Sequence, residues 1–271
     1  MSQDWSRAAS GWRKWHRRFA VQSAALTSLI ISGAQLRRGM NVLDLASGSG
    51  EPALPEAKLV GPDGHITATD TSSEMLLVAE ENARSLGLGN LTFLQVDSQE
   101  LPFPDESFDV VTCRLGLMFF PDPVAVLREV RRVLRRGGRA SFVTWGPIDQ
   151  NPRFASTFGV LQSDPVVRAK ISQPELFRYK SPESLIKLLR EAGFGEVSAV
   201  YHTVPFTWNG PVREAWECFS ELSAPFQRAF AQVPAEDRER ITKAILESIG
   251  RYYDGRTVNF TAGVVLASCT R

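Results

Sequence analysis

Short apolar runs alternate with amphipathic segments between residues 40 and 145 of this chain. An alternation of this kind is typical of parallel strands joined by crossover helices. The expected strands are residues 41–45, 66–69, 91–96, 108–113 and 140–145, and the expected helices are residues 51–60, 73–86 and 122–135. Turns rich in glycine at 61–64 and 136–139 separate some of these segments. The pattern therefore predicts an α/β fold built on a parallel sheet.

The pattern changes after Trp145, where glycine and proline residues mark a linker. The expected elements are the linker at 146–152, helices at 153–162 and 181–192, a strand at 196–208, two or three helices within 211–251 and a closing strand at 257–270. The excursion between the two late strands is about 45 residues long, which is too long for a structureless loop. We therefore expect its helices to pack over the rest of the fold as a cap.

Composition limits the possible partners. The 271 residues carry 31 basic and 30 acidic side chains, a net charge of +1, which gives no electrostatic footprint for nucleic acid. Cys113, Cys218 and Cys269 form no C-x-x-C pair, and no histidine or acidic cluster has the spacing of metal ligands. Residues 19–34 contain too many polar side chains to span a bilayer and are expected to form an amphipathic helix. These features favour a cytoplasmic protein with no metal and no membrane span.

The most informative segment is residues 41–54, where an apolar strand leads into a loop of small residues and then a helix start. Such a loop presents backbone N–H groups that a ligand can approach closely. Gly48-x-Gly50-x-x-Ala53, followed by Asp70 after the next strand, formally matches the dinucleotide-binding pattern. An NAD(P)-dependent dehydrogenase is therefore one alternative for this chain.

The acidic residues around this loop indicate a different ligand. Asp44 and Glu51 bracket the loop, Asp70 ends the second strand and Asp97 ends the third. A pyrophosphate charge about 5 Å from one such carboxylate would be repelled by on the order of 3 kcal/mol at an effective dielectric constant of about 20. Carboxylates at this edge instead favour a cationic ligand, such as one carrying an ammonium and a sulfonium group.

The chain also carries a set of spaced motifs that resembles one enzyme family. Residues 42–50, 69–76, 95–98 with 101–111, and 127–139 resemble, in order, the motifs of class I S-adenosylmethionine-dependent methyltransferases. The chain departs from the family pattern at Ala46, where glycine is usual, and at Arg136, where proline is usual. The resemblance implies a Rossmann-like, seven-stranded, mostly parallel sheet with helices on both faces and a helical cap before an antiparallel last strand. It also implies S-adenosyl-L-methionine as cofactor and S-adenosyl-L-homocysteine as its product.

The resemblance implies a role for each matching residue. Asp70 would accept hydrogen bonds from the two ribose hydroxyls, with a helix-capping aspartate as the alternative, and Asp97 would accept one from the adenine amino group. Asp44 would help to hold the methionine ammonium, or would be a buried carboxylate bonded to the loop. Arg114 would line the methionine end or neutralise a carboxylate. The expected cofactor site comprises Asp44, Ala46, Ser47, Gly48, Gly50, Asp70, Thr71, Met75, Asp97, Ser98, Arg114, Leu115 and Gly116.

A methyl acceptor would face the residues that follow the fourth and fifth strands. This rim is aromatic and apolar, which favours a hydrophobic, ring-containing small molecule, although its phenylalanines could instead belong to the core. The N-terminal segment resembles the lid of the ubiquinone/menaquinone-type C-methyltransferases. The expected substrate-lining residues are Trp12, Trp15, Met118, Phe119, Phe120 and Trp145. His16 and His202 are the candidates for a general base, because histidine titrates near neutral pH.

We therefore expect residues 1–37 to form a helical lid, 38–146 a cofactor-binding core, and 147–271 to complete the sheet and carry a cap at about 211–251. The expected reaction is methyl transfer by in-line displacement to a carbon or oxygen atom of an apolar small molecule. The alternatives are the NAD(P)-dependent oxidoreductase and a catalytically lapsed module that only binds S-adenosylmethionine. The acceptor, the methylated atom and the oligomeric state do not follow from the sequence.

Overall fold

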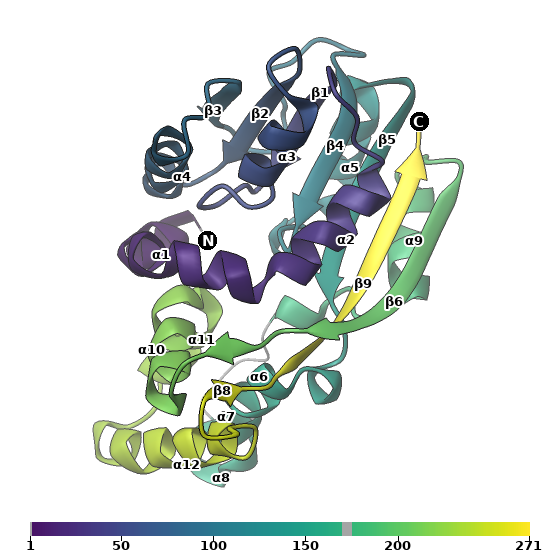
Figure 1. The fold of residues 1–271 in the computed structure, drawn as a ribbon. Helices are drawn as coiled ribbons and strands as arrows, with labels where there is room; N and C mark the ends of the chain where they lie inside the picture. Colours follow the sequence, from purple (N-terminus) through teal and green to yellow (C-terminus); the bar gives the residue numbers. More distant parts are fainter. Residues whose placement is uncertain (1, 170–174) are drawn as a thin grey trace.

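The computed structural model describes residues 2–169 and 175–271. Its main sheet has seven strands in the order β3-β2-β1-β4-β5-β9-β6 (Figure 1). These strands are β1 (Asn41–Leu45), β2 (His65–Asp70), β3 (Leu91–Gln95), β4 (Phe108–Arg114), β5 (Leu134–Trp145), β6 (Val197–Pro205) and β9 (Thr261–Thr270). Strands β1 to β5 pair in parallel, whereas β9 lies antiparallel between β5 and β6. The carboxyl ends of β1, β2, β4 and β5 therefore meet at one edge of the sheet, where ligands bind in folds of this kind.

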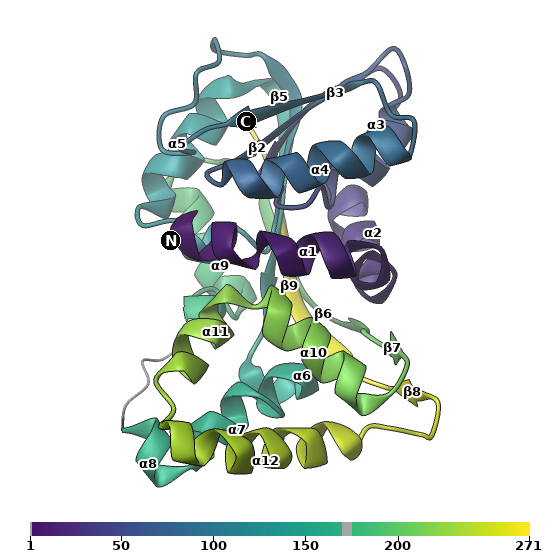
Figure 2. The same cartoon turned by 90° about the vertical axis from the view of Figure 1, so that its left-hand side faces the viewer.

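Helices cover both faces of the sheet. Helices α2 (Ala24–Ala34) and α3 (Ala53–Val60) lie on one face, and α5 (Pro123–Val133) and α9 (Pro182–Glu191) lie on the other (Figure 2). Helix α4 (Ser73–Ser85) packs along β2 and β3. The apolar residues of α5 recur every three or four positions and are buried, as expected for a helix that covers a sheet on one side. Both faces of the central strands are thereby removed from water.

A cap lies beyond the carboxyl edge of the sheet (Figures 1 and 2). It comprises α6 (Pro152–Ala155), α7 (Phe158–Ser163), α8 (Pro165–Arg168), α10 (Val212–Leu222), α11 (Ala224–Ala231), α12 (Arg238–Gly250) and a small sheet of β7 (Trp208–Asn209) and β8 (Thr257–Val258). Single 3₁₀ turns occur at η1 (Leu117–Phe119), η2 (Ile148–Gln150), η3 (Glu175–Phe177) and η4 (Ala235–Asp237). The cap is thus built from two segments of the chain. One lies between β5 and β6, and the other lies between β6 and β9.

Helix α1 (Ser2–Gln22) lies between the sheet region and the cap (Figure 2). On one side, Arg13 donates to both carboxylate oxygens of Glu81 on α4, at 2.7 and 2.9 Å. On the other side, Lys14 Nζ and Trp15 Nε1 donate to Glu221 on α10, at 2.8 and 2.9 Å. A Cβ atom on Gly11 would lie 2.6 Å from the Glu221 carbonyl oxygen, so glycine permits the close approach of α1 and α10. Helix α1 therefore connects the two halves of the molecule.

The predicted fold class is confirmed, and most predicted elements are present within a few residues. Five segments differ in detail. The helix expected at 19–34 is interrupted at Ser23, so that its residues belong to α1 and α2. The helix expected at 153–162 is divided into α6 and α7. The strand expected at 196–208 is interrupted between β6 and β7, and the strand expected at 257–270 is interrupted between β8 and β9. The turn expected at 136–139 lies within β5 as a register shift against β4. Within the described ranges, no helix is long and apolar enough to cross a membrane.

Candidate active site

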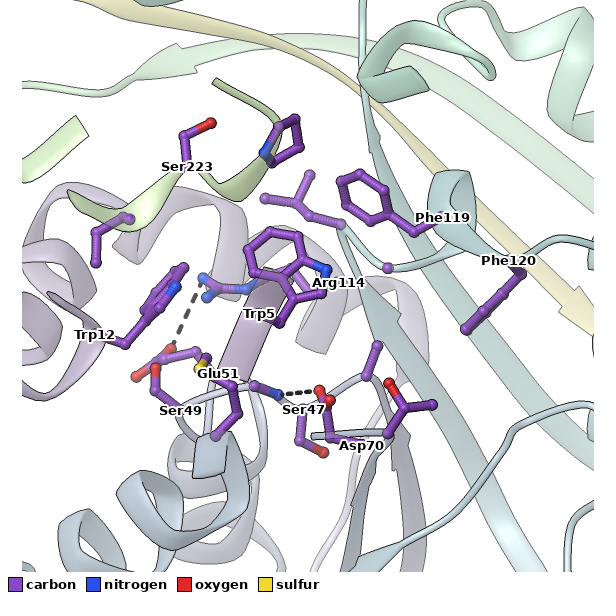
Figure 3. Close-up of a pocket in the computed structure, with 18 of the residues that line it drawn as sticks. Trp5, Trp12, Ser47, Ser49, Glu51, Asp70, Arg114, Phe119, Phe120 and Ser223 are labelled. Carbon is purple, nitrogen blue, oxygen red and sulfur yellow. Dashed lines mark hydrogen bonds and ion pairs between the residues drawn. The ribbon is translucent and has the colours of Figure 1, made fainter. Parts of the chain in front are cut away.

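A cavity of about 670 Å³ lies where the carboxyl ends of the strands face α1 and the cap (Figure 3). The loops after β1 and β2 contribute residues 46–49, Glu51, Asp70 and Thr71, the loop after β3 contributes residues 95–99, and the segment after β4 contributes residues 114–116 and 119–121. Helix α1 and the cap close the opposite side. A volume of this size is typical of small-molecule sites. In the part of the chain that the structure describes, no group of three or more His, Cys, Asp or Glu residues is placed to hold a metal ion.

The glycine loop between β1 and α3 is fixed from three directions. The Gly48 N–H donates to Asp70 Oδ2 at 3.0 Å, which joins the loop to the end of β2. Asn82 of α4 donates to the Ser49 carbonyl oxygen at 3.1 Å, and His16 Nδ1 of α1 lies 3.0 Å from Ser49 Oγ. The loop is therefore held in one conformation before any ligand binds.

Asp70 has the geometry expected of a carboxylate that receives hydroxyl groups. Its Oδ1 accepts the Ser72 N–H at 2.9 Å and its Oδ2 accepts the Gly48 N–H, so each oxygen keeps a lone pair for a further donor. Burial raises the pKa of Asp70, and these backbone N–H groups lower it again in part. Additional donors from a ligand in the cavity would stabilise its charged form. Asp97 lies at the same end of the cavity and is exposed.

Glu51 and Arg114 form the other polar end of the cavity. Their charged groups lie 3.9 Å apart and both side chains are largely buried (Figure 3). Thr27 links them, because its Oγ1 accepts from Arg114 Nη1 at 2.9 Å and donates to Glu51 Oε2 at 3.0 Å. Ser23 Oγ accepts from the same Arg114 nitrogen at 3.1 Å. Arg114 therefore pairs with a carboxylate and also lines the cavity.

Of the two roles expected for Asp44, the structure agrees with that of a buried carboxylate. It is fully buried behind the loop, next to the buried Glu56 of α3. Thr112 Oγ1 lies 3.1 Å from Asp44 Oδ1 and 3.3 Å from Glu56 Oε2, and one hydroxyl proton serves one carboxyl group at a time. Burial raises the pKa of Asp44 to about 7 and that of Glu56 well above its ordinary value. Asp44 is therefore part of the core, where Thr112 of β4 joins it to Glu56 of α3.

The acceptor side of the cavity is aromatic. Trp5, Trp12 and Phe19 line it from α1, at a seven-residue spacing that places them on one face of the helix. Trp5 packs edge-on against Phe119 with ring centroids 5.4 Å apart, and Trp145 packs against Phe154 at 4.9 Å. The cap adds further lining residues, which are Arg153, Phe154, Leu176, Phe219, Leu222, Ser223 and Pro225.

Most predicted site residues line this one cavity. They are Ala46, Ser47, Gly48, Asp70, Thr71, Met75, Asp97, Ser98, Arg114, Leu115 and Gly116 of the cofactor set, and Trp12, Phe119, Phe120 and Trp145 of the substrate set. Asp44 and Gly50 lie outside the lining, as do Trp15, which packs against Trp208, and Met118. Met118 is buried in the core because η1 is a 3₁₀ turn, in which successive side chains point in different directions.

Neither histidine proposed as a base lines the cavity. His16 is buried against Ser49, and burial, together with the nearby Arg114 and Arg17, lowers its pKa to about 4. It is therefore neutral at physiological pH and acts on the loop. His202 lies on the edge strand β6, with β9 between it and the rest of the sheet. The strand order separates it from the carboxyl ends of β1 and β4.

Sequence reasoning missed Trp5, Phe19 and Arg153 among the cavity residues. The seven-residue spacing of Trp5, Trp12 and Phe19 was a usable signal, since such a spacing predicts one helix face. The cap residues gave no comparable signal, because their position depends on how distant segments fold together.

Comparison with known proteins agrees with this architecture. A family described as "Methyltransferase domain" matches residues 36–162. The ubiquinone/menaquinone biosynthesis C-methyltransferase UbiE of Proteus mirabilis is 32% identical over 181 residues, which cover 62% of this chain and 71% of that protein. The demethylmenaquinone methyltransferase of Listeria welshimeri is 40% identical over 109 residues, which cover 40% of this chain and 46% of that protein. The chain thus spans about half the length of the Listeria relative.

Solved structures show the same fold. The YcgJ protein of Bacillus subtilis superposes with a TM-score of 0.59 at 23% identity, over 92% of this chain and 98% of that one. A putative methyltransferase of Bacillus halodurans superposes with a TM-score of 0.57 at 25% identity, over 91% and 98% of the two chains.

The fold and these relatives define a class I S-adenosylmethionine-dependent methyltransferase. The chain belongs to this family, and within it is similar to the UbiE-type C-methyltransferases. These relatives give no support to the dehydrogenase alternative.

Proposed function

We propose that this protein binds S-adenosylmethionine in the cavity and transfers its methyl group to a small, apolar, ring-containing acceptor. The observation that carries the proposal is Asp70, whose carboxylate is fixed by Gly48 and Ser72 while keeping two lone pairs at the cavity wall. A vicinal diol can donate to both oxygens of such a carboxylate.

The residues present suit this cofactor along its whole length. Asp97 and Ser98 would receive the adenine end, Asp70 the ribose, and the backbone from Ala46 to Gly48 the methionine portion. Glu51 would attract the ammonium, while its pairing with Arg114 limits the net negative charge of that end. Met75 supports the loop from beneath, because a Cβ on Gly48 would lie 3.4 Å from its Cε.

When bound, S-adenosylmethionine supplies a methyl group on a positively charged sulfur, which a nucleophilic atom of the acceptor takes by in-line displacement. The chain's own residues orient the acceptor and exclude water from the reaction. Phe119, Phe120 and Trp145 offer flat apolar surfaces for a ring, and Trp5 and Trp12 cover them from α1. We propose on this basis that α1 acts as the lid of the site. The quinone-pathway names of the relatives are consistent with a ring-containing acceptor.

Calorimetry with S-adenosylhomocysteine tests the proposal. The wild-type protein is expected to bind it, and Asp70→Asn is expected to weaken binding at least tenfold, because charge-assisted hydrogen bonds contribute about 1.5–3 kcal/mol each. Asp63→Asn, in the exposed turn after α3, is the matched control and should bind like wild type. Absence of binding by the wild-type protein, or heat with NADH instead, would refute the proposal. Binding of S-adenosylhomocysteine without methyl transfer to any quinol, phenol or aromatic acid tested would assign a lapsed module.

A further inference from the structure

Arg153 is a buried guanidinium without an acidic partner. It lies on α6, lines the cavity and is only 9% exposed. Among the described residues, no side chain or carbonyl group accepts a hydrogen bond from its guanidinium, and no carboxylate lies within ion-pair distance. Buried arginines are rarely left unpaired, because removing a charge from water costs several kcal/mol. Its presence at the cavity wall therefore calls for a ligand.

Aromatic rings hold Arg153 in place. Its guanidinium carbon lies 4.7 Å from the ring centroid of Phe219, 5.3 Å from that of Phe206 and 5.4 Å from that of Phe19. Such cation–π contacts are attractive, which offsets part of the cost of removing the charge from water. These rings come from α1, the segment after β6 and α10, so three distant segments fix the guanidinium in position.

Arg114, a second buried arginine that lines the cavity, differs from Arg153 because it has polar partners. Arg114 is paired with Glu51 and bonded to Ser23 and Thr27, so its charge is already used within the protein. Among the described residues, Arg153 has no such carboxylate or hydroxyl partner. Burial lowers its pKa to about 10, which still leaves it charged at neutral pH. A ligand that enters the aromatic half of the cavity therefore meets one uncompensated positive charge.

We propose that Arg153 binds a carboxylate carried by the methyl acceptor, so that the acceptor is an aromatic acid rather than a neutral ring. This inference rests on the proposed function and narrows its substrate class. The planar guanidinium matches a carboxylate with two parallel hydrogen bonds, which a single hydroxyl cannot reproduce. Phe119, Phe154 and Trp145 provide the apolar walls for the ring of such an acid.

Matched probes test the charge preference. Binding of 1-naphthoate, 1-naphthamide and 1-naphthol is measured by calorimetry on protein saturated with S-adenosylhomocysteine. The wild-type protein should bind 1-naphthoate at least tenfold more tightly than either neutral probe, and Arg153→Met should remove that preference. Arg153→Lys should retain part of it, because the charge remains but the planar pair of donors does not. Arg18→Met is the control, since Arg18 also stacks on an aromatic ring, Trp208, but already pairs with Glu214.

Thermal unfolding separates a binding role from a structural one. Arg153→Met replaces an unpaired buried charge by an apolar side chain of similar length, so its melting temperature should equal or exceed that of wild type. A lower melting temperature together with an unchanged probe preference would show that Arg153 is structural and would overturn the inference.

The remaining outcomes are also distinct. If Arg153→Met weakens S-adenosylhomocysteine binding tenfold, Arg153 binds the carboxylate of the cofactor and not that of the acceptor, and the inference is wrong. Equal wild-type affinity for the three probes, no measurable 1-naphthoate binding, or tighter binding of 1-naphthol would overturn the aromatic-acid class. A wild-type protein that binds no S-adenosylhomocysteine would instead contradict the proposed function itself.

Discussion

Ala46 and Gly116 meet so closely that a Cβ atom placed on Gly116 would lie 2.6 Å from the Cβ of Ala46. Ala46, at the position where glycine is usual in the family, has a φ of 52°, a left-handed conformation that costs alanine about 1–2 kcal/mol. Gly116 provides the space that the extra methyl group needs. The two residues therefore act as a pair that joins the loops after β1 and β4.

This pairing predicts the outcome of a double-mutant cycle. Ala46→Gly should change the free energy of unfolding by less than about 1 kcal/mol, since relief of strain offsets the greater freedom of glycine in the unfolded chain. Gly116→Ala should destabilise the protein by about 1–3 kcal/mol through overpacking. The double variant should recover part of that loss in urea unfolding, although Cys113 Sγ, 2.8 Å from the same Cβ position, limits the recovery. Strict additivity of the two changes would mean that the residues do not act as a pair.

The buried carboxyl pair of Asp44 and Glu56 predicts a pH-dependent stability. Because their pKa values are raised in the folded state, that state holds more protons than the unfolded chain, and stability is lost as the pH rises towards about 7 and above. Glu56→Gln removes one titrating group and should therefore melt at a higher temperature than wild type at pH 8.

The difference in melting temperature between Glu56→Gln and wild type is the quantity to measure from pH 5 to pH 8. It should grow by about 2–4 °C or more over this range, because a shift of one pKa unit corresponds to about 1.4 kcal/mol. Glu239→Gln, an exposed residue of α12, should show no such trend. A constant difference for Glu56→Gln would show that the pair does not titrate in this range.

The buried imidazole of His16 predicts that stability changes with pH in the direction opposite to that expected from Asp44 and Glu56. Its pKa is lowered to about 4 in the folded protein, so the unfolded chain binds a proton first and stability falls as the pH drops from about 6.5 towards 4. The loss attributable to His16 is on the order of 3 kcal/mol. His16→Gln should remove it, so that the stability advantage of wild type over the variant shrinks on acidification. Urea unfolding of both proteins at pH 7, 5.5 and 4.5 measures this change.

The central fold could be predicted from the sequence because its signals are local. The alternation of apolar runs gave β1 to β5, and the small-residue loop with Asp70 gave the site at the sheet edge. Periodicity did not show that Asp44 points into the core beside Glu56, because two residues from separate elements meet there only in three dimensions. The sequence placed Arg114 among the acids of the site, whereas the second arginine of the cavity, Arg153, appears only in the structure.

The acceptor half of the site was less predictable because it is assembled from α1 and the cap. Phe19, Arg153 and Phe219 come from three distant segments, and no local pattern indicates that they contact one another. The break between α6 and α7 was also missed, yet it places Arg153 and Phe154 at the cavity. Packing between distant segments, rather than propensity, decides these positions.

The contact between Trp5 and Phe119 predicts how α1 controls the site. Trp5 lines the cavity from the first turns of α1 and packs edge-on against Phe119, which follows β4. Trp5→Ala removes this contact, worth about 0.5–1.5 kcal/mol beyond the lost apolar area. S-adenosylhomocysteine should therefore dissociate about three- to tenfold faster, with a much smaller change in the association rate, in stopped-flow measurements.

Two further variants test whether faster dissociation results from losing the contact between Trp5 and Phe119. Trp5→Phe retains an edge-on ring and should dissociate at close to the wild-type rate. Tyr252→Ala removes a similar edge-on contact with Phe260, 5.1 Å between centroids, in residues that do not line the cavity, and should leave dissociation unchanged. If Trp5→Ala alters melting temperature but not the dissociation rate, α1 is a structural helix between the sheet and the cap and not a lid. If the Tyr252 variant dissociates equally fast, the effect follows from overall stability, because a contact remote from the cavity would then act in the same way.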